Sequence, residues 1–217
     1  MQEFKHLQYQ NLNWYHFNQA LSPEDQDFLH DTFSFSRSDL EYCRSKKSPR
    51  PRLTLTKKYL YLIFHIPFKP FGTSRLKIAE LNVFVTPTTL ITIESKGNLA
   101  ALDHFLLQTQ KSKKLLQSRF SSGMATLFSK LILKILSALE EDIDQQGEHI
   151  DRLHREIFEK RLAKKFVETT STIRYNQVLS QHAISRQIRF FDQYKGDKNP
   201  LIPFNHSSKT NWNKKER

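Results

Sequence analysis

The sequence is poor in the residues that build covalent cross-links and phosphate-binding loops. Its one cysteine, Cys43, excludes an internal disulfide and fits a reducing compartment. Its five glycines form no glycine-rich phosphate loop, and no nucleophile elbow, metalloprotease helix or paired-cysteine metal motif occurs. We therefore expect no enzyme activity.

Long apolar runs are also missing. The most apolar stretch, residues 131–139, is short and contains Lys134, and no basic start followed by an apolar run opens the chain. We therefore expect this chain alone to be soluble and cytoplasmic.

Charge of one sign is abundant, because 34 lysines and arginines face 22 acids and give a net charge of +12. Such an excess is typical of proteins that meet nucleic acid, an anionic membrane surface or an acidic partner. The bases gather at 44–58, 111–119 and 195–217, without the interleaved aromatics of a single-strand-binding surface. A cytosolic domain beneath a membrane carries the same bias. A basic, soluble nucleic-acid-binding module is thus the alternative, and nucleic acid is not the partner we expect.

The first 120 residues alternate between strand and helix patterns. Runs rich in β-branched and aromatic residues predict strands at 12–17, 53–56, 59–67, 77–86 and 89–94. Ser22-Pro23-Glu24-Asp25 is a strong helix start, and further helices are expected at 36–43 and 99–109. The nearly continuous apolar run 59–66 is typical of a strand covered on both faces, so we expect it at the centre of the sheet.

A long helical run begins after Gly123 and continues past Phe158. One stripe of this helix carries a heptad-like seam: Leu136, Leu139, Ile143, Gln146, Ile150, Leu153 and Ile157. The opposite face is first acidic and then basic, as expected of a face in water. At 1.5 Å per residue the run reaches about 50 Å, so it should project from a domain of this size. A second run, 162–194, is expected to fold back along it.

These patterns predict an α+β fold. Residues 1–120 would form an α/β/α sandwich with a mixed sheet, and residues 121–197 a long antiparallel helical hairpin. Residues 198–217 would be a basic tail.

The acidic span 140–151 is a candidate for weak cation binding, with Glu140, Asp144 and Glu148 as candidate ligands. Hard cations prefer carboxylate oxygens, and Mg²⁺ keeps much of its water. The competing interpretation is a solvated charged helix face. Asp151 and His154 also stand three residues apart, but a metal site needs more ligands than this pair.

Several segments, taken in order, carry a family resemblance. Trp14 is followed by Ser22-Pro23-Glu24, and Ser48-Pro49-Arg50-Pro51-Arg52 precedes the strand 59–66. Ala79-Glu80-Leu81-Asn82-Val83-Phe84-Val85 and Leu90-Ile91-Thr92-Ile93 then look like a strand pair, and Ile150 to Phe158 like a helix end. In this order the sequence resembles the CorA-like divalent cation transporters, which include the ZntB zinc branch.

The resemblance implies the cytosolic regulatory and assembly domain of a transporter for magnesium, with zinc and cobalt as the alternative cations. In the family such domains form homopentamers on the cytoplasmic face of the inner (plasma) membrane. A stalk helix, which residues 198–217 would begin, leads into two membrane spans and a Gly-Met-Asn signature. Gly123-Met124-Ala125 is not that signature. The resemblance also places Asp197 near an acidic regulatory ligand, with weakly bound magnesium as the expected cation.

Overall fold

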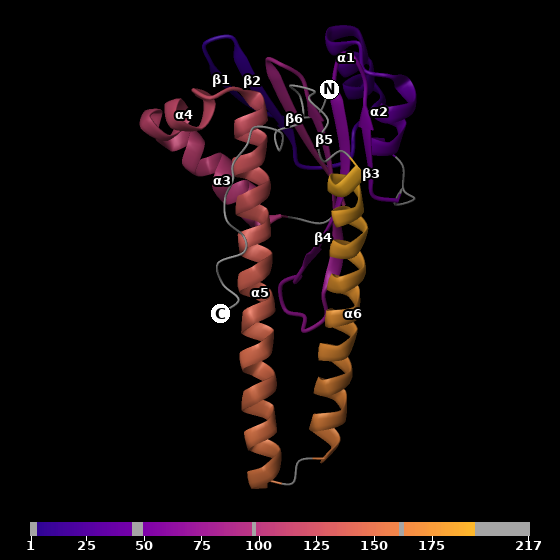
Figure 1. The fold of residues 1–217 in the computed structure, drawn as a ribbon, viewed down its shortest axis with the longest axis vertical. Coiled ribbons are helices and arrows are strands. Elements are labelled where there is room, and N and C mark those ends of the chain that lie inside the picture. The colour runs from indigo at the N-terminus through magenta and orange to yellow at the C-terminus, as the bar shows by residue number, and fades with distance from the viewer. Residues whose placement is uncertain (1–3, 45–49, 97–98, 161–162, 194–217) are drawn as a thin grey trace.

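A computed structural model describes residues 4–44, 50–96, 99–160 and 163–193, with side chains given only in part in the two long helices. A mixed sheet lies between helices, and two long helices extend beyond it (Figure 1). The strands are β1 (Lys5–Tyr9), β2 (Leu12–Phe17), β3 (Arg52–Leu55), β4 (Leu60–Phe68), β5 (Lys77–Val85) and β6 (Thr89–Lys96). The helices are α1 (Pro23–Phe33), α2 (Arg37–Arg44), α3 (Ala100–Lys111), α4 (Lys113–Phe120), α5 (Met124–Lys160) and α6 (Ala163–Gln193). The predicted α+β class is confirmed.

The six strands lie in the order β1-β2-β6-β5-β4-β3. Only the β2–β6 pair is parallel among the strands described, with Trp14 opposite Leu90, so the sheet is mixed. The expectation that residues 59–66 form the sheet centre is wrong, because β6 and β5 occupy the middle and β4 is second from the edge. The apolar run of β4 reflects burial on both faces, which a strand next to the edge also has when helices cover both sides.

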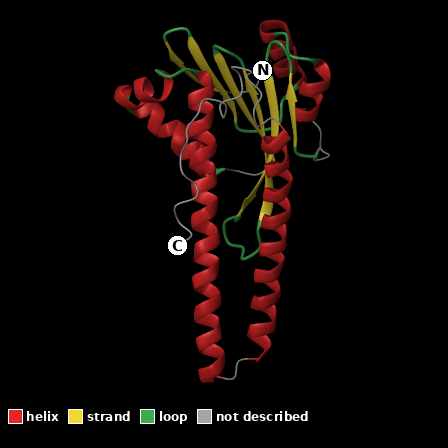
Figure 2. Cartoon of the chain, viewed as in Figure 1, coloured by secondary structure: helices red, strands yellow, loops and turns green. Residues whose placement is uncertain are grey.

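Two hydrophobic cores lie on opposite faces of the sheet, as the red helices flanking the yellow strands in Figure 2 indicate. Helices α1 and α2 cover one face, where Leu29 and Leu40 pack with Phe84 and Ile91. Helices α3, α4 and α5 cover the other. Their buried side chains on that face are Leu102, Phe105, Leu106, Phe120, Met124, Leu127, Phe128, Leu131, Ile132 and Ile135. Alternate residues of each strand supply the two cores, as the pleat requires.

Local sequence explains where α1 begins and where β5 turns into β6. The Ser22 side chain accepts from the Asp25 amide while the Asp25 carboxylate accepts from the Ser22 amide, and Pro23 occupies the first turn. Between β5 and β6, the Thr86 amide donates to the Thr89 carbonyl and the Thr89 amide donates to the Thr86 hydroxyl. The predicted helix start at Ser22 is confirmed.

Two elements escaped prediction. β1 pairs with β2 at the sheet edge, where its alternating polar residues hid it. α4 lies inside the basic stretch 111–119, where Ser112 caps the helix and Phe120 at its end is fully buried. The lysines of α4 lie on its solvent-exposed side. The basic composition therefore describes only that side and does not reveal the side that packs against the protein.

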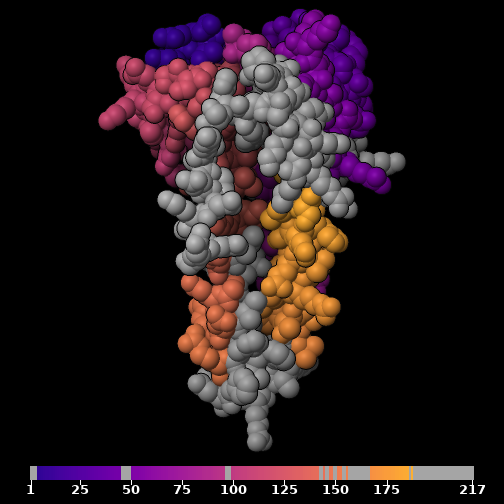
Figure 3. Space-filling view, viewed as in Figure 1, coloured from indigo at the N-terminus to yellow at the C-terminus, as the bar shows by residue number. Residues whose placement is uncertain are grey.

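The long helices α5 and α6 contain 37 and 31 residues and run side by side in opposite directions, as predicted (Figure 1). Their far halves form the narrow lower end of the molecule, below the broader part that holds the N-terminal elements (Figure 3). The first half of α5 packs into the sheet core, so the sheet and this half of α5 share one hydrophobic interior. Leu139 is buried as the seam predicts, but Leu136 is 47% exposed. The other seam side chains, from Ile143 onward, lie outside those described.

Candidate functional site on the paired helices α5 and α6

The candidate metal ligands on α5 share one helix face. Glu140, Asp144 and Glu148 are all exposed and follow one another at four-residue spacing. That spacing places successive carboxylates about 6 Å apart along the helix. Each can hold a hydrated cation from one side, since Mg²⁺ retains water and is usually bound through one or two carboxylates.

The described residues do not close a metal site around these carboxylates. No group of three or more histidine, cysteine, aspartate or glutamate side chains converges within the described part of the chain. Asp197 lies outside the described residues. Asp151 is exposed, as expected of a solvated helix face, and the His154 side chain is outside those described. A single chain thus offers a row of solvated carboxylates on α5.

Helix α6 is anchored to the sheet by two amide side chains. The Asn176 side chain accepts from the Leu76 amide at 2.8 Å and donates to the Ser74 carbonyl at 2.9 Å. About three turns further along the same face of α6, the Gln187 side chain donates to the His65 carbonyl. Asn176 is 4% exposed and Leu76 is 2% exposed, so the first bond satisfies a backbone amide that is buried away from water.

The Gln187 anchor lies at the part of β4 that β3 leaves unpaired. β3 pairs with Leu60 to Ile63, so among the described strands none lies beside the β4 edge beyond Ile63 on that side. α6 covers this stretch, and Gln187 bonds to its backbone at His65. An uncovered edge is a template for unwanted strand pairing, which a packed helix prevents. Sequence patterns did not reveal these contacts, because asparagine and glutamine on a helix are ordinarily read as solvent-facing residues.

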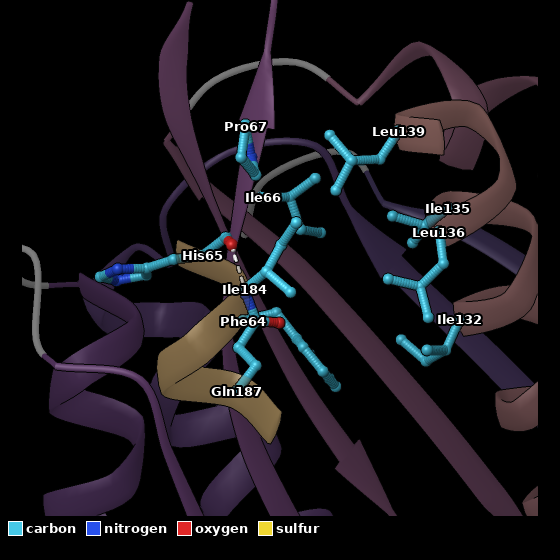
Figure 4. A pocket seen from close by; sticks show the side chains of 10 residues that line it. All are labelled: Phe64, His65, Ile66, Pro67, Ile132, Ile135, Leu136, Leu139, Ile184 and Gln187. Carbon is cyan, nitrogen blue, oxygen red and sulfur yellow. Dashed lines mark hydrogen bonds between the residues drawn. The ribbon is translucent and has the colours of Figure 1, made fainter. Parts of the chain in front are cut away.

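A cavity of about 180 Å³ lies between β4, α5 and α6 (Figure 4). It is lined by Phe64, His65, Ile66, Pro67, Ile132, Ile135, Leu136, Leu139, Ile184 and Gln187. The α5 side chains point across it toward β4, and the Gln187 bond to His65 lies at its border (Figure 4). The lining is almost wholly apolar, so the cavity suits a hydrophobic side chain and not a cation.

A buried acid and a buried base, Glu94 and His16, lie on neighbouring strands of the sheet, close to the start of α3. His16 Nε2 is 3.6 Å from Glu94 Oε1, and both atoms are inaccessible to solvent. Burial lowers the pKa of His16 to about 4 and raises that of Glu94 to about 7, because each charged form loses its hydration. The other Glu94 oxygen accepts from the Leu99 amide at 3.0 Å, which ties the pair to the first turn of α3.

Other buried polar groups lie in the core between the sheet and helices α1 and α2. Cys43 is fully buried on α2, where desolvation raises the pKa of its thiol far above the usual value. The Tyr61 hydroxyl donates to Asn82 Oδ1 at 2.7 Å, and the Tyr59 hydroxyl donates to Asp39 Oδ2 at the same distance. A buried, protonated thiol is a poor nucleophile, so Cys43 contributes to the packing of this core.

Within the described helices, none is by itself long and apolar enough to cross a membrane. Lys113–Phe120 and Met124–Glu141 reach the required length and composition only together, with a bend of 111° between them.

Comparison with solved structures places the fold among known proteins. The chain matches the soluble domain of CorA from Methanocaldococcus jannaschii with a TM-score of 0.73 and 15% identity, covering 88% of this chain and 73% of that one. It matches the complete CorA magnesium transporter of the same organism with a TM-score of 0.72 and 16% identity, covering 90% of this chain and 59% of that one. The ZntB cytoplasmic domain of Vibrio parahaemolyticus gives 0.53 and 15% identity, covering 86% and 75%.

Structural similarity at such low sequence identity establishes the fold alone. This chain spans little more than half of the complete transporter's length. Among curated proteins no match is found. The family model for the CorA-like Mg²⁺ transporter protein matches residues 9–210. That family consists of transporters, which agrees with the expectation of a non-enzyme. Because the match covers nearly the whole chain, the chain belongs to the CorA-like Mg²⁺ transporter family.

Proposed function

We propose that this chain is the cytosolic regulatory and assembly domain of a divalent cation transporter whose pore is built by other segments. The family match over residues 9–210 carries this proposal. Magnesium is the favoured cation, with zinc or cobalt as less favoured ones. In the full-length protein the domain would assemble as a homopentamer on the cytoplasmic face of the inner membrane. The nucleic-acid alternative draws no support from the comparisons.

The regulatory cation would bind to the exposed carboxylates of α5, with Asp197 as a further ligand. Glu140, Asp144 and Glu148 lie on one face at a spacing that leaves each carboxylate its own water shell. A row of this kind attracts hydrated Mg²⁺ through charge and does not strip its water, so a single chain should bind weakly, at about millimolar concentration. A neighbouring protomer would complete the site.

Calorimetric titration with MgCl₂ at constant ionic strength tests this assignment. The chain should bind Mg²⁺ with a dissociation constant of about 1 mM or weaker. The variant Glu140→Gln/Asp144→Asn/Glu148→Gln should reduce the binding heat, whereas Asp27→Asn, on the other side of the sheet in an exposed pair with Arg37, should not. Equal heats for the triple variant and the parent would reject α5 as the cation-binding face. Micromolar affinity would mean that one chain holds a complete site.

Electrophoretic mobility shifts separate the transporter domain from the nucleic-acid alternative. A nucleic-acid-binding module would give saturable shifts whose affinity falls steeply with salt. We expect only weak, unsaturated association at low salt, caused by the charge of +12, and none at physiological salt.

A further inference from the structure

The cavity between β4, α5 and α6 has the chemistry of a docking site for an apolar side chain. Ile132, Ile135 and Ile184 face it, and Leu136, also in its lining, is 47% exposed. A cavity of about 150 Å³ lined by such residues accommodates a benzene ring. The present volume of about 180 Å³ therefore has room for one large apolar side chain.

The sequence that follows α6 contains a matching segment. Residues 194–217 lie outside the described residues and are mostly polar or basic. Within them stands a compact apolar cluster, Pro200-Leu201-Ile202-Pro203-Phe204. We propose that this segment, 200–204, docks into the cavity of its own chain and covers the apolar faces of α5 and β4.

The tether allows this contact. Gln187, at the border of the cavity, precedes the last residue of α6, Gln193, by about 9 Å of helix. The eight residues from Gln193 to Leu201 can span up to about 28 Å, so the segment can turn back and reach the cavity. A tether this short keeps the segment at an effective concentration of about millimolar, which favours the same chain over a separate partner.

The composition of the segment also favours binding in an apolar site. Pro200 and Pro203 have no amide hydrogen, so fewer backbone donors lose water without a partner. Their fixed φ angles reduce the entropy that is lost on ordering. Leu201, Ile202 and Phe204 then offer side chains of the size that the cavity accepts.

A second copy of the chain is the competing occupant. Phe71, at the tip of the β4–β5 loop, is fully solvent-exposed and is the apolar side chain that another molecule would bring. This contact needs association between molecules, without the advantage of a tether. The two occupants differ in whether the contact forms within one chain or between chains.

Disulfide trapping distinguishes them. The pair Leu136→Cys/Ile202→Cys tests the cavity, and Leu133→Cys/Ile202→Cys is the matched control, since Leu133 is 54% exposed on the same helix and does not line the cavity. The native Cys43 is fully buried and does not compete. Under mild oxidation the first pair should close within the chain about tenfold faster than the control. Equal rates, or disulfides only between chains, would overturn the proposal.

Substitution of the segment gives an independent readout. Ile202→Asp/Phe204→Asp should release it, so that an apolar fluorescent dye binds the parent weakly and the variant several-fold more strongly. Ser207→Asp/Thr210→Asp changes charge equally in the same tail and should leave dye binding unchanged. Identical dye binding by the parent and by Ile202→Asp/Phe204→Asp would contradict docking.

Discussion

His16 and Glu94 face each other inside the protein, with 3.6 Å between Nε2 and Oε1 and no other partner for either atom among the described residues. His16 comes from β2 and Glu94 from the parallel neighbour β6. Thr92 Oγ1 lies 3.0 Å from the other His16 ring nitrogen, and the Leu99 amide donates to the other Glu94 oxygen. The ion pair Lys5–Asp103 adds charge of both signs nearby. The pair therefore titrates in a desolvated setting.

This pair predicts a pH dependence of opposite sign for two variants. In the unfolded chain His16 titrates near 6.5 and Glu94 near 4.5, against folded pKa values of about 4 and about 7. The lowered pKa of His16 costs stability as pH falls, and the raised pKa of Glu94 costs stability as pH rises. Between pH 4.5 and 6.5 the two effects cancel in the parent, because folded and unfolded states each hold one proton.

Glu94→Gln leaves only the histidine effect, so its free energy of unfolding should rise with pH across this interval. His16→Gln leaves only the carboxyl effect, so its free energy of unfolding should fall. Each slope approaches, at most, about 1.4 kcal/mol per pH unit. Urea unfolding at several pH values measures both slopes. Two variants with parallel pH profiles would contradict the assignment of the pair.

The two hydrogen bonds of the Asn176 side chain should hold the β4–β5 loop in place. Asn176→Ala removes the partner of the buried Leu76 amide and of the Ser74 carbonyl, which should cost about 1–3 kcal/mol. The neighbouring Gln177→Ala, at an exposed position, should change stability little. Hydrogen exchange should show faster exchange of the Leu76 amide in the first variant only. Unchanged exchange there would show that the loop is held by other contacts.

The first half of α5 should behave as core and not as a detachable hairpin. Phe128 is fully buried against the sheet and lies near Phe64, so Phe128→Ala should cost about 3–5 kcal/mol. Leu133→Ala, on the exposed side of the same helix, should change stability by less than about 0.5 kcal/mol. Thermal unfolding followed by circular dichroism compares them. Similar melting of both variants would argue that α5 contributes little to the core.

Cys43 should be unreactive in the folded protein. It is fully buried and its pKa is raised by desolvation, so little thiolate forms and reagents cannot reach it. A thiol reagent such as 5,5′-dithiobis(2-nitrobenzoic acid) should react with it only after unfolding, at a rate set by opening of the α2 face. Rapid labelling of the native protein would mean that α2 detaches readily from the sheet.

The sequence by itself determined the elements whose signals are local. Runs of β-branched and aromatic residues located β2 to β6, the start signal from Ser22 to Asp25 located α1, and the apolar stripe located α5, because each pattern is contained in one segment of the chain. The order of the motifs along the sequence, from Trp14 to Phe158, also carried the family resemblance, which the match over residues 9–210 confirms.

Tertiary structure decided what depends on neighbours. The order of strands in the sheet depends on which strands pair, and the sequence of one strand does not reveal its neighbours. β4, which is apolar on both faces, therefore lies second from the edge and not at the centre. The His16–Glu94 pair, the Asn176–Leu76 hydrogen bond and the cavity between β4, α5 and α6 each join elements whose contributing residues are at least 45 positions apart. No periodic pattern encodes such contacts, since they arise only when separate segments pack and the water between them is removed.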